Sequence, residues 1–218
     1  MKKNIPLLLF LSIFFILSIN SHASHNRNIK AINMEIFKDG KIIGYSNYFF
    51  KHEKNILEVK NYTKFKVKLF NVAVFSVEGE TLERYKKNKL IYFKSQTYQN
   101  DKIKYVNLYY DEKKNKFIID GSSFTGKTDI DAIIGNWWNH KILDSNKQIS
   151  PLSGSVKPQI ITFIGEENIE LYGKNYLVEH YKLKSVDQNL PKNKKLDFDI
   201  WLNPKNNLIL KVLYHRLG

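Results

Sequence analysis

The 218-residue chain contains no cysteine. A bacterial lipoprotein carries a cysteine directly after its signal sequence, so lipid attachment by that route is excluded. Without cysteine no disulfide can form, and no metal site can use a thiolate ligand. We therefore expect the fold to depend on burial of an apolar core, for which a chain of this length is sufficient.

Arginine is scarce: the basic excess is almost wholly lysine, although the net charge is +14. Arginine is found only at Arg27, Arg84 and Arg216. Sites that recognise nucleic-acid bases favour the two parallel donors of arginine, so we expect no nucleic-acid partner. The charge is consistent either with a solvated lysine surface or with attraction to an anionic envelope surface such as lipid headgroups.

Motifs for catalysis and for metal binding are also missing. No two histidines after the N-terminal segment have the spacing of metal ligands, and there is no His-Glu-x-x-His run. Ser153-Gly154-Ser155 lacks the frame of a hydrolase nucleophile turn. We expect no metal, no cofactor and no catalytic residue, and we rank an enzyme of unknown reaction as the least favoured function.

The N-terminus has the features of a secretory signal sequence. Lys2 and Lys3 precede an apolar run from Ile5 to Ile19, and small residues lead to a cleavage point after Ala23. The rival interpretation is a retained anchor, but the run is shorter than the about 20 residues of a spanning helix. We expect a signal peptide at 1–23, a single antiparallel β domain at 24–218, and a periplasmic protein without a transmembrane segment.

Alternation of apolar and polar residues predicts strands through most of the chain. The alternation from Asn28 to Phe37 is followed by Asp39-Gly40, a pair typical of two-residue hairpins. The alternation over 57–69 is the clearest, with lysines on one face. Residues 70–77 are apolar on both faces, which predicts a deeper position. Further strands are expected at 90–98, 103–110, 116–120, 159–164, 176–183, 194–202 and 208–214.

The stretch Ile133–His140 interrupts this pattern and places Trp137 beside Trp138. Thr128 and Asp129 are typical of a helix start, so we expect a short helix through Trp138, followed by a loop over 141–157. The predicted fold is mainly β. It is a single strongly curved antiparallel sheet, or half-open barrel, with this helix against its concave face.

Several segments resemble an exported bacterial family, domain-of-unknown-function family 6134. They are Lys38–Gly44, Phe70–Phe75, Glu83-Arg84-Tyr85, Trp138-Asn139, Leu152-Ser153-Gly154 and Phe198–Leu202. The resemblance implies a distant similarity to periplasmic lipoprotein carriers, in which a sheet curled around a helix shelters acyl chains. It implies no catalytic residues.

The favoured hypothesis is a non-catalytic protein that binds an apolar or amphipathic envelope component, for example a lipid, in a curled sheet. The expected ligand-lining residues are Phe65, Val67, Leu69, Val74, Trp137, Trp138, Asn139, His140, Phe198 and Ile200. For the tryptophan pair, the alternative is structural: one indole fills the end of the sheet, the other covers it, and Asn139 caps the helix. The alternative function is an envelope interaction module without a small ligand.

Overall fold

The computed structural model describes residues 29–70, 72–191 and 194–215. The predicted signal sequence and its cleavage point after Ala23 lie outside these residues. Within them the protein is mainly β, as predicted, and its one helical segment is a single turn of 3-10 helix, η1 (His140–Leu143). The prediction of a large antiparallel sheet is confirmed.

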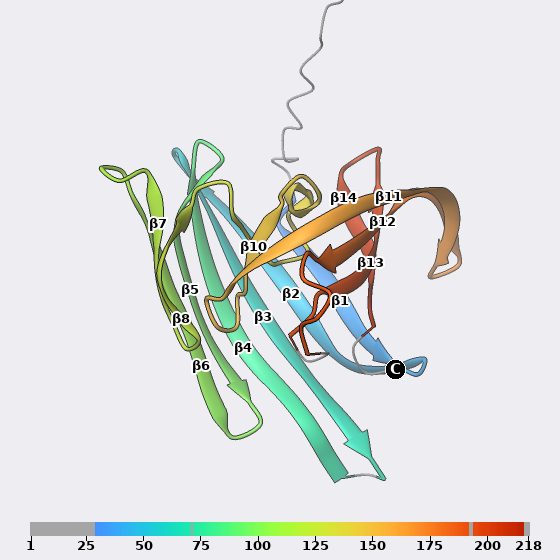
Figure 1. Cartoon of the computed structure of the whole chain (residues 1–218). Coiled ribbons are helices and arrows are strands. Elements are labelled where there is room, and N and C mark those ends of the chain that lie inside the picture. The colour runs from blue at the N-terminus through green and yellow to red at the C-terminus, as the bar shows by residue number, and fades with distance from the viewer. Residues whose placement is uncertain (1–28, 71, 192–193, 216–218) are drawn as a thin grey trace, which may run out of the picture.

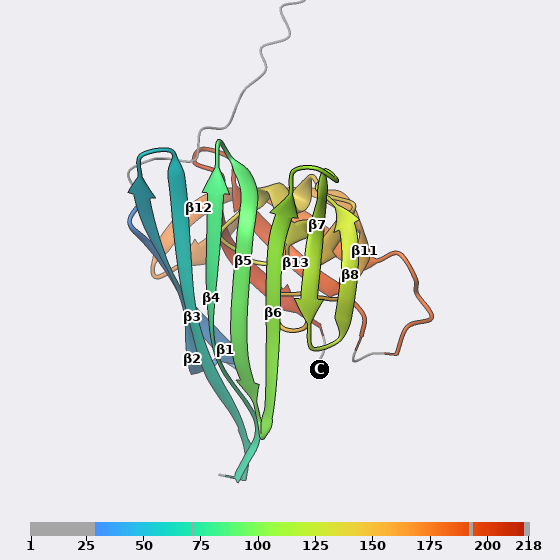
Figure 2. The ribbon, with the colours of Figure 1, turned by 90° about the vertical axis from the view of Figure 1, so that its left-hand side faces the viewer.

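The first sheet contains eight strands that pair in chain order, each antiparallel to the next (Figures 1 and 2). Because every connection joins neighbours, the sheet is a meander with β1 and β8 at its two edges. Its strands are β1 (Ala31–Lys38), β2 (Lys41–Glu53), β3 (Ile56–Leu69), β4 (Val72–Lys86), β5 (Lys89–Gln99), β6 (Lys102–Asp111), β7 (Lys116–Gly121) and β8 (Phe124–Asp129).

The remaining strands form a second sheet of six, so the prediction of a single sheet was wrong. After β8 the chain turns, with the Ala132 amide donating to the Asp129 carbonyl at 3.2 Å, and the next strand pairs in parallel with β10 instead of extending the first sheet. Figure 2 shows the second sheet behind the first. In spatial order it contains β14 (Leu208–Tyr214), β13 (Asp197–Asn203), β12 (Lys174–Ser185), β11 (Val156–Leu171), β10 (Lys147–Ile149) and β9 (Ile133–Ile134).

The first hairpin forms as the sequence predicts. Lys38 pairs with Lys41, and the two residues between them adopt positive φ, +50° at Asp39 and +72° at Gly40. Glycine and aspartate tolerate this left-handed conformation better than most residues. The local sequence therefore fixes the register of β1 against β2.

The alternation in β3 also has its predicted consequence. Val59 and Val67 are buried on one face, and Lys60, Lys64 and Lys66 are exposed on the other. One side of the first sheet thus carries the apolar core, and the other presents lysines to solvent.

The predicted helix through Trp138 is wrong. Thr128 and Asp129 belong to β8, where they pair with Phe117 and Lys116, and residues 133–134 form β9. Backbone pairing with neighbouring strands satisfies these residues, so no helix starts here. Asp129 and Asp131 both form ion pairs with Lys147, at 3.1 and 2.9 Å, instead of capping a helix.

The predicted deep position of residues 70–77 is also wrong, except at Val77. The ladder between β2 and β3 starts at Gly44 and Phe65, and that between β4 and β5 starts at Val77 and Gln99. In the described structure, residues 66–70 and 72–75 therefore pair with no strand outside the β3–β4 hairpin. We call these residues the free ribbon. In Figure 1 the end of this hairpin projects beyond the rest of the sheet. Phe70 is 93% exposed and Val72 is 65% exposed, because no other part of the described chain packs over them.

Two apolar clusters hold the sheets together. The first gathers on the inner face of the first sheet around Phe93, Leu108, Ile119 and Trp138. The second lies under the second sheet around Ile142, Leu183 and Ile200 and includes Trp137 at its margin. The tryptophan pair therefore contributes one indole to each cluster.

Candidate functional site

The side chains of Trp137 and Trp138 pack into different apolar clusters, Trp137 into the second and Trp138 into the first. The Trp138 ring makes edge contacts with Phe50 and Tyr85, with centroids 5.3 and 5.6 Å apart. The Trp137 ring packs on Phe198 at 4.9 Å. Because each ring is engaged with a different sheet, the pair joins the two layers and does not form one continuous aromatic wall.

Asn139 and His140, the polar residues after the tryptophan pair, lie in the same segment between the two sheets. Asn139 is buried, and its side-chain oxygen accepts from the Lys141 amide at 3.2 Å, which caps η1. Its own amide donates to the Asn136 side chain at 3.3 Å. His140 is half-buried, and this burial lowers the pKa of its imidazole. Asn139 thus has the structural role that the sequence left open, although the element it caps is a 3-10 turn.

A buried carboxyl lies beneath the tryptophan pair, and the sequence did not predict it. Glu83 on β4 is 1% exposed. Its Oε1 accepts from Asn136 Nδ2 at 2.9 Å and from Trp138 Nε1 at 3.1 Å, and its Oε2 accepts from the Tyr85 hydroxyl at 2.5 Å. Two side chains of the crossover, Asn136 and Trp138, therefore donate to the same buried carboxyl as Tyr85 of β4.

Burial raises the pKa of Glu83 to about 7, although the hydrogen bonds from Tyr85, Trp138 and Asn136 oppose the rise. Desolvation disfavours the charged carboxylate, and neutral donors compensate only part of that cost. Glu83 therefore exchanges a proton near neutral pH. Tyr48, which is also buried and accepts from the Trp137 amide at 3.4 Å, has its pKa raised to about 12 by desolvation and stays neutral.

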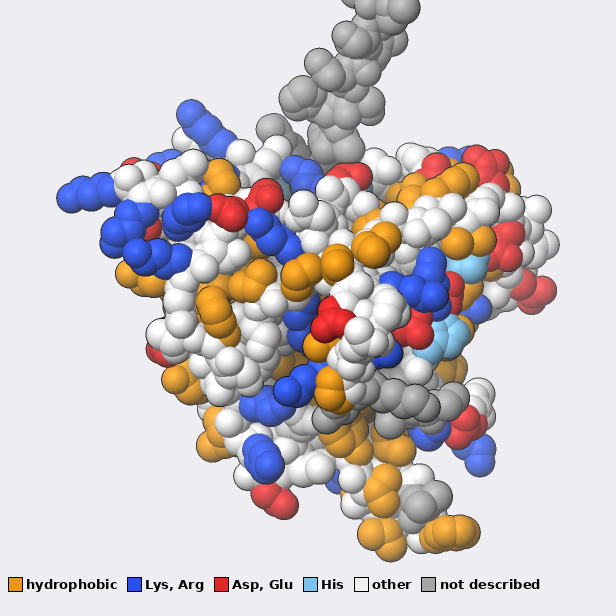
Figure 3. Space-filling view, in the orientation of Figure 1, with side chains coloured by type: hydrophobic (Ala, Val, Ile, Leu, Met, Phe, Trp, Pro, Cys, Tyr) orange, Lys and Arg blue, Asp and Glu red, His pale blue; other side chains and the backbone are white. Residues whose placement is uncertain are grey.

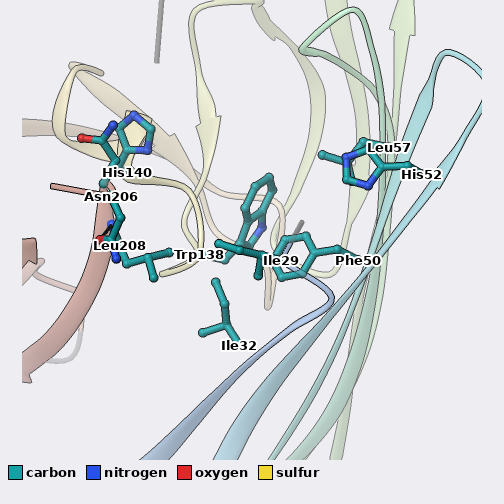
Figure 4. Close-up of a pocket in the computed structure, with 10 residues that line it drawn as sticks. Ile29, Ile32, Phe50, His52, Leu57, Trp138, His140, Asn206 and Leu208 are labelled. Atoms are coloured by element: carbon teal, nitrogen blue, oxygen red, sulfur yellow. Dashed lines mark hydrogen bonds between the residues drawn. The ribbon is translucent and has the colours of Figure 1, made fainter. Parts of the chain in front are cut away.

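A narrow cavity adjoins Trp138 (Figure 4). Figure 4 shows His52, Leu57 and Phe50 on one side of the indole, with His140 and Leu208 on the other. The volume is about 40 Å³, enough for about three water molecules. This space is too small for an acyl chain, so it cannot hold the apolar ligand that Trp138 and His140 were expected to line.

A larger groove lies where the free ribbon leaves the first sheet. Its volume is about 410 Å³, within the range of about 300–1,000 Å³ that is typical of small-molecule sites. Ile43, Phe65 and Val77 are the apolar residues in its lining besides the tyrosines. Lys64 and Lys66 supply positive charge, and Lys64 pairs with Glu78 at 2.8 Å. Tyr45, Ser76, Tyr98 and Asn100 complete most of the remaining lining.

The structure divides the ten predicted lining residues among several places. Phe65 lines the groove, and Val67 and Val74 are on the free ribbon, where Val67 is buried and Val74 is half exposed. The side chain of Leu69 lies outside the described part of the structure. Phe198 and Ile200 belong to the second apolar cluster with Trp137, whereas Trp138 and His140 border the small cavity. These residues therefore do not share one cavity.

A second polar cluster lies on β12 and β13. Asp199 accepts from His180 Nε2 and from Lys182 Nζ, both at 2.8 Å, and from His215. Burial alone would raise its pKa, but the hydrogen bonds from Lys182, His215 and His180 outweigh burial and hold the pKa well below the usual range. The sequence predicts that Asp199 lies in a strand over 194–202 but gives no sign of these partners. The cluster joins strands by ion pairing, with the ring of His180 stacked on Trp201 at 4.6 Å.

Two kinds of site are not found within residues 29–70, 72–191 and 194–215. No group of three histidine or acidic side chains is arranged to hold a metal ion. No helix in these ranges is long and apolar enough to cross a membrane.

These observations define a two-layer, mainly antiparallel β protein whose sheets meet at a buried glutamate. The model of one family, described as "Domain of unknown function (DUF6134)", matches residues 34–218, so the chain belongs to that family. The resemblance inferred from the hairpin and tryptophan segments is thereby confirmed. A search of curated proteins and a search of solved structures each found no significant match.

Proposed function

We propose that this is a non-catalytic protein of the bacterial periplasm that binds an amphipathic envelope component. The observation that carries the proposal is the groove of about 410 Å³ beside the free ribbon. The residues that line it include the apolar Ile43, Phe65 and Val77 and the basic Lys64 and Lys66. That combination suits a ligand with an apolar chain and an anionic head.

The signal-like N-terminus, with an expected cleavage point after Ala23, supports the proposed location. A chain in the periplasm meets phospholipids and other amphiphiles, which fits the groove. In this proposal the first sheet forms the wall of a trough, as the half-open barrel predicted from the sequence would, and the second sheet closes its upper part. The similarity to lipoprotein carriers is part of the same proposal.

The distribution of titratable groups supports binding without catalysis. Glu83 has the raised pKa that a general acid needs, but it is sealed among Tyr85, Asn136 and Trp138. The charged pair at the groove, Lys64 and Glu78, is open to solvent. A carboxyl with no route to the groove cannot act on a ligand bound there.

Isothermal titration with a monoacyl phosphatidylglycerol, below its micelle concentration, tests the proposal. We expect one binding site and at least about tenfold weaker binding of monoacyl phosphatidylcholine, because two lysines face the head. Lys64→Gln should weaken binding of the anionic ligand about tenfold. The matched control is Lys94→Gln, since Lys94 is an exposed lysine on β5 away from the groove. Equal binding of both lipids, or equal losses in both variants, would contradict the proposal.

A further inference from the structure

The tip of the free ribbon is the most exposed apolar feature of the first sheet. Phe70 is 93% exposed, Val72 65% and Val74 50%. Figure 3 shows hydrophobic side chains gathered at the lower end of the molecule, where Figure 1 places the β3–β4 hairpin. A soluble domain rarely leaves a phenylalanine at the end of a projecting hairpin unless that residue meets a partner.

The ribbon is held in its projecting position. The Ser76 amide donates to the Asn100 side chain at 2.7 Å, and the Asn100 amide donates to the Ser76 carbonyl at 3.0 Å, which fixes the base of the hairpin against the β5–β6 turn. Within the hairpin, the rings of Phe65 and Phe75 are in contact, with centroids 5.8 Å apart. The tip is therefore carried on a two-stranded support with its own apolar contact.

The two ends of the first sheet differ in character. Four hairpin turns share the end that carries the tip, and further exposed apolar side chains lie beside two of these turns, Phe37 and Ile42 at the β1–β2 turn and Ile103 at the β5–β6 turn. The opposite end consists of polar turns, at 54–55, 87–88 and 112–115. Among the described residues of the first sheet, the four most exposed apolar side chains, Phe70, Val72, Ile103 and Ile42, thus lie at this rim.

The charge near this rim is positive. Lys66 and Lys68 are exposed on the ribbon, and Lys41 and Lys102 flank the neighbouring turns. In the described residues no ion pair is formed by any of these four lysines, although Asp39 and Asp101 lie in the same turns. An exposed apolar tip with lysine ammonium groups around it is complementary to a bilayer with anionic headgroups. The tip can enter the boundary of the acyl chains while the lysines contact the phosphates.

We propose that the free ribbon docks the protein on the surface of an anionic lipid bilayer, with Phe70, Val72 and Val74 inserted and Lys66 and Lys68 at the headgroups. This goes beyond ligand binding in the groove. The groove begins at the base of the ribbon, so docking brings its opening close to the lipid. Docking itself does not require the groove to be occupied.

The absence of cysteine makes a site-specific test possible. A single cysteine introduced by Val72→Cys, and labelled with a polarity-sensitive dye, reports burial of the tip itself, whatever other parts of the chain bind. The matched reporter is Asn88→Cys, at the polar end of the same sheet. Both proteins are mixed with vesicles of phosphatidylglycerol and phosphatidylethanolamine, and separately with vesicles of phosphatidylcholine alone.

We expect a blue shift of the dye at position 72 with anionic vesicles, its loss at high salt or with neutral vesicles, and no shift at position 88. Adding Phe70→Ser should weaken binding about tenfold or more, and Lys68→Gln about fivefold. Tyr109→Ser alters an exposed residue near the polar end of β6, and Lys94→Gln alters an exposed residue in the middle of β5; both should leave binding unchanged. Circular dichroism establishes that each variant keeps its β structure.

Three results would overturn the proposal. One is a dye at position 72 that does not respond to anionic lipid. Another is an equal response at positions 72 and 88, which would place the membrane contact elsewhere. The third is a response that requires an added protein and fails with pure lipid, which would make the partner a protein. If Lys64→Gln abolishes binding of the monoacyl ligand but leaves the dye response intact, docking stands and is separate from the groove.

Discussion

The protonation of Glu83 leads to the sharpest quantitative prediction. Its carboxyl is 1% exposed, and burial raises its pKa to about 7 from a model-compound value of 4.5. Between about pH 4.5 and about pH 7, the folded protein therefore binds more protons at Glu83 than the unfolded chain does. The contribution of Glu83 to stability is greatest below about pH 4.5 and is lost as the pH rises to about 7.

The size of the effect follows from the same two values. Each pKa unit corresponds to about 1.4 kcal/mol, so the free energy of unfolding should fall by about 3 kcal/mol across this window because of Glu83. Glu83→Gln imitates the protonated carboxyl: its oxygen still accepts from Asn136 and Trp138, and its amide donates to the Tyr85 oxygen. We expect the variant to match the parent at about pH 4.5 and to exceed it by about 3 kcal/mol at about pH 8.

Urea unfolding followed by tryptophan fluorescence, from about pH 4 to about pH 8.5, measures the free energy of unfolding of the parent and of Glu83→Gln as a function of pH. The difference between the two proteins isolates the titration of Glu83 from that of all other groups. Glu83→Ala is the control, because it removes the acceptor of three buried donors and also the titrating group. It should cost about 3 kcal/mol or more at about pH 4.5, and this cost should shrink toward about pH 8 as the parent itself loses stability. A Glu83→Gln protein that is clearly less stable than the parent at about pH 8 would show that the carboxylate is ionised and well paired in the fold, which would refute this reasoning.

Three further predictions concern the folded state. Gly44→Ala should lower the free energy of unfolding by about 2 kcal/mol or more in a urea titration, because the new Cβ would lie 2.0 Å from the Lys64 carbonyl oxygen; an unchanged midpoint would contradict this. Trp137→Ala removes the ring packed on Phe198 and should cost about 3 kcal/mol by the same assay, whereas a loss below about 1 kcal/mol would show that this indole does not join the layers. Asp199→Asn should be less stable than the parent at neutral pH, and the difference should disappear as acid protonates Asp199 in the parent, because its folded pKa is lowered; a difference that persists in acid would argue against the ion pairs.

Local signals in the sequence predicted the first half of the fold well. The hairpin at Asp39-Gly40 depends only on the positive φ of two adjacent residues, and the alternation in β3 depends only on which face is buried. Both are decided by neighbours in sequence. The second sheet was missed because the parallel pairing of β9 with β10 joins short strands separated by the loop and η1.

The candidate site was harder to predict because its partners are distant in the chain. In the sequence, Glu83 is one of several charged residues in a polar segment, which gives no reason to expect its burial. That burial depends on Asn136 and Trp138, which lie 53 and 55 residues away. The apolar segment around Val74 was expected to be deep, but burial also requires flanking strands. Because β2 and β5 end before the tip, the same residues remain exposed.

Native mass spectrometry of the protein isolated from a bacterial envelope tests the central claim, that the groove holds an amphipathic envelope component, most directly. We predict a one-to-one adduct with the mass of an anionic amphiphile, strongly reduced in Lys64→Gln and retained in Lys94→Gln. A protein that is released as the bare chain, or an adduct that is unaffected by Lys64→Gln, would contradict the proposed function.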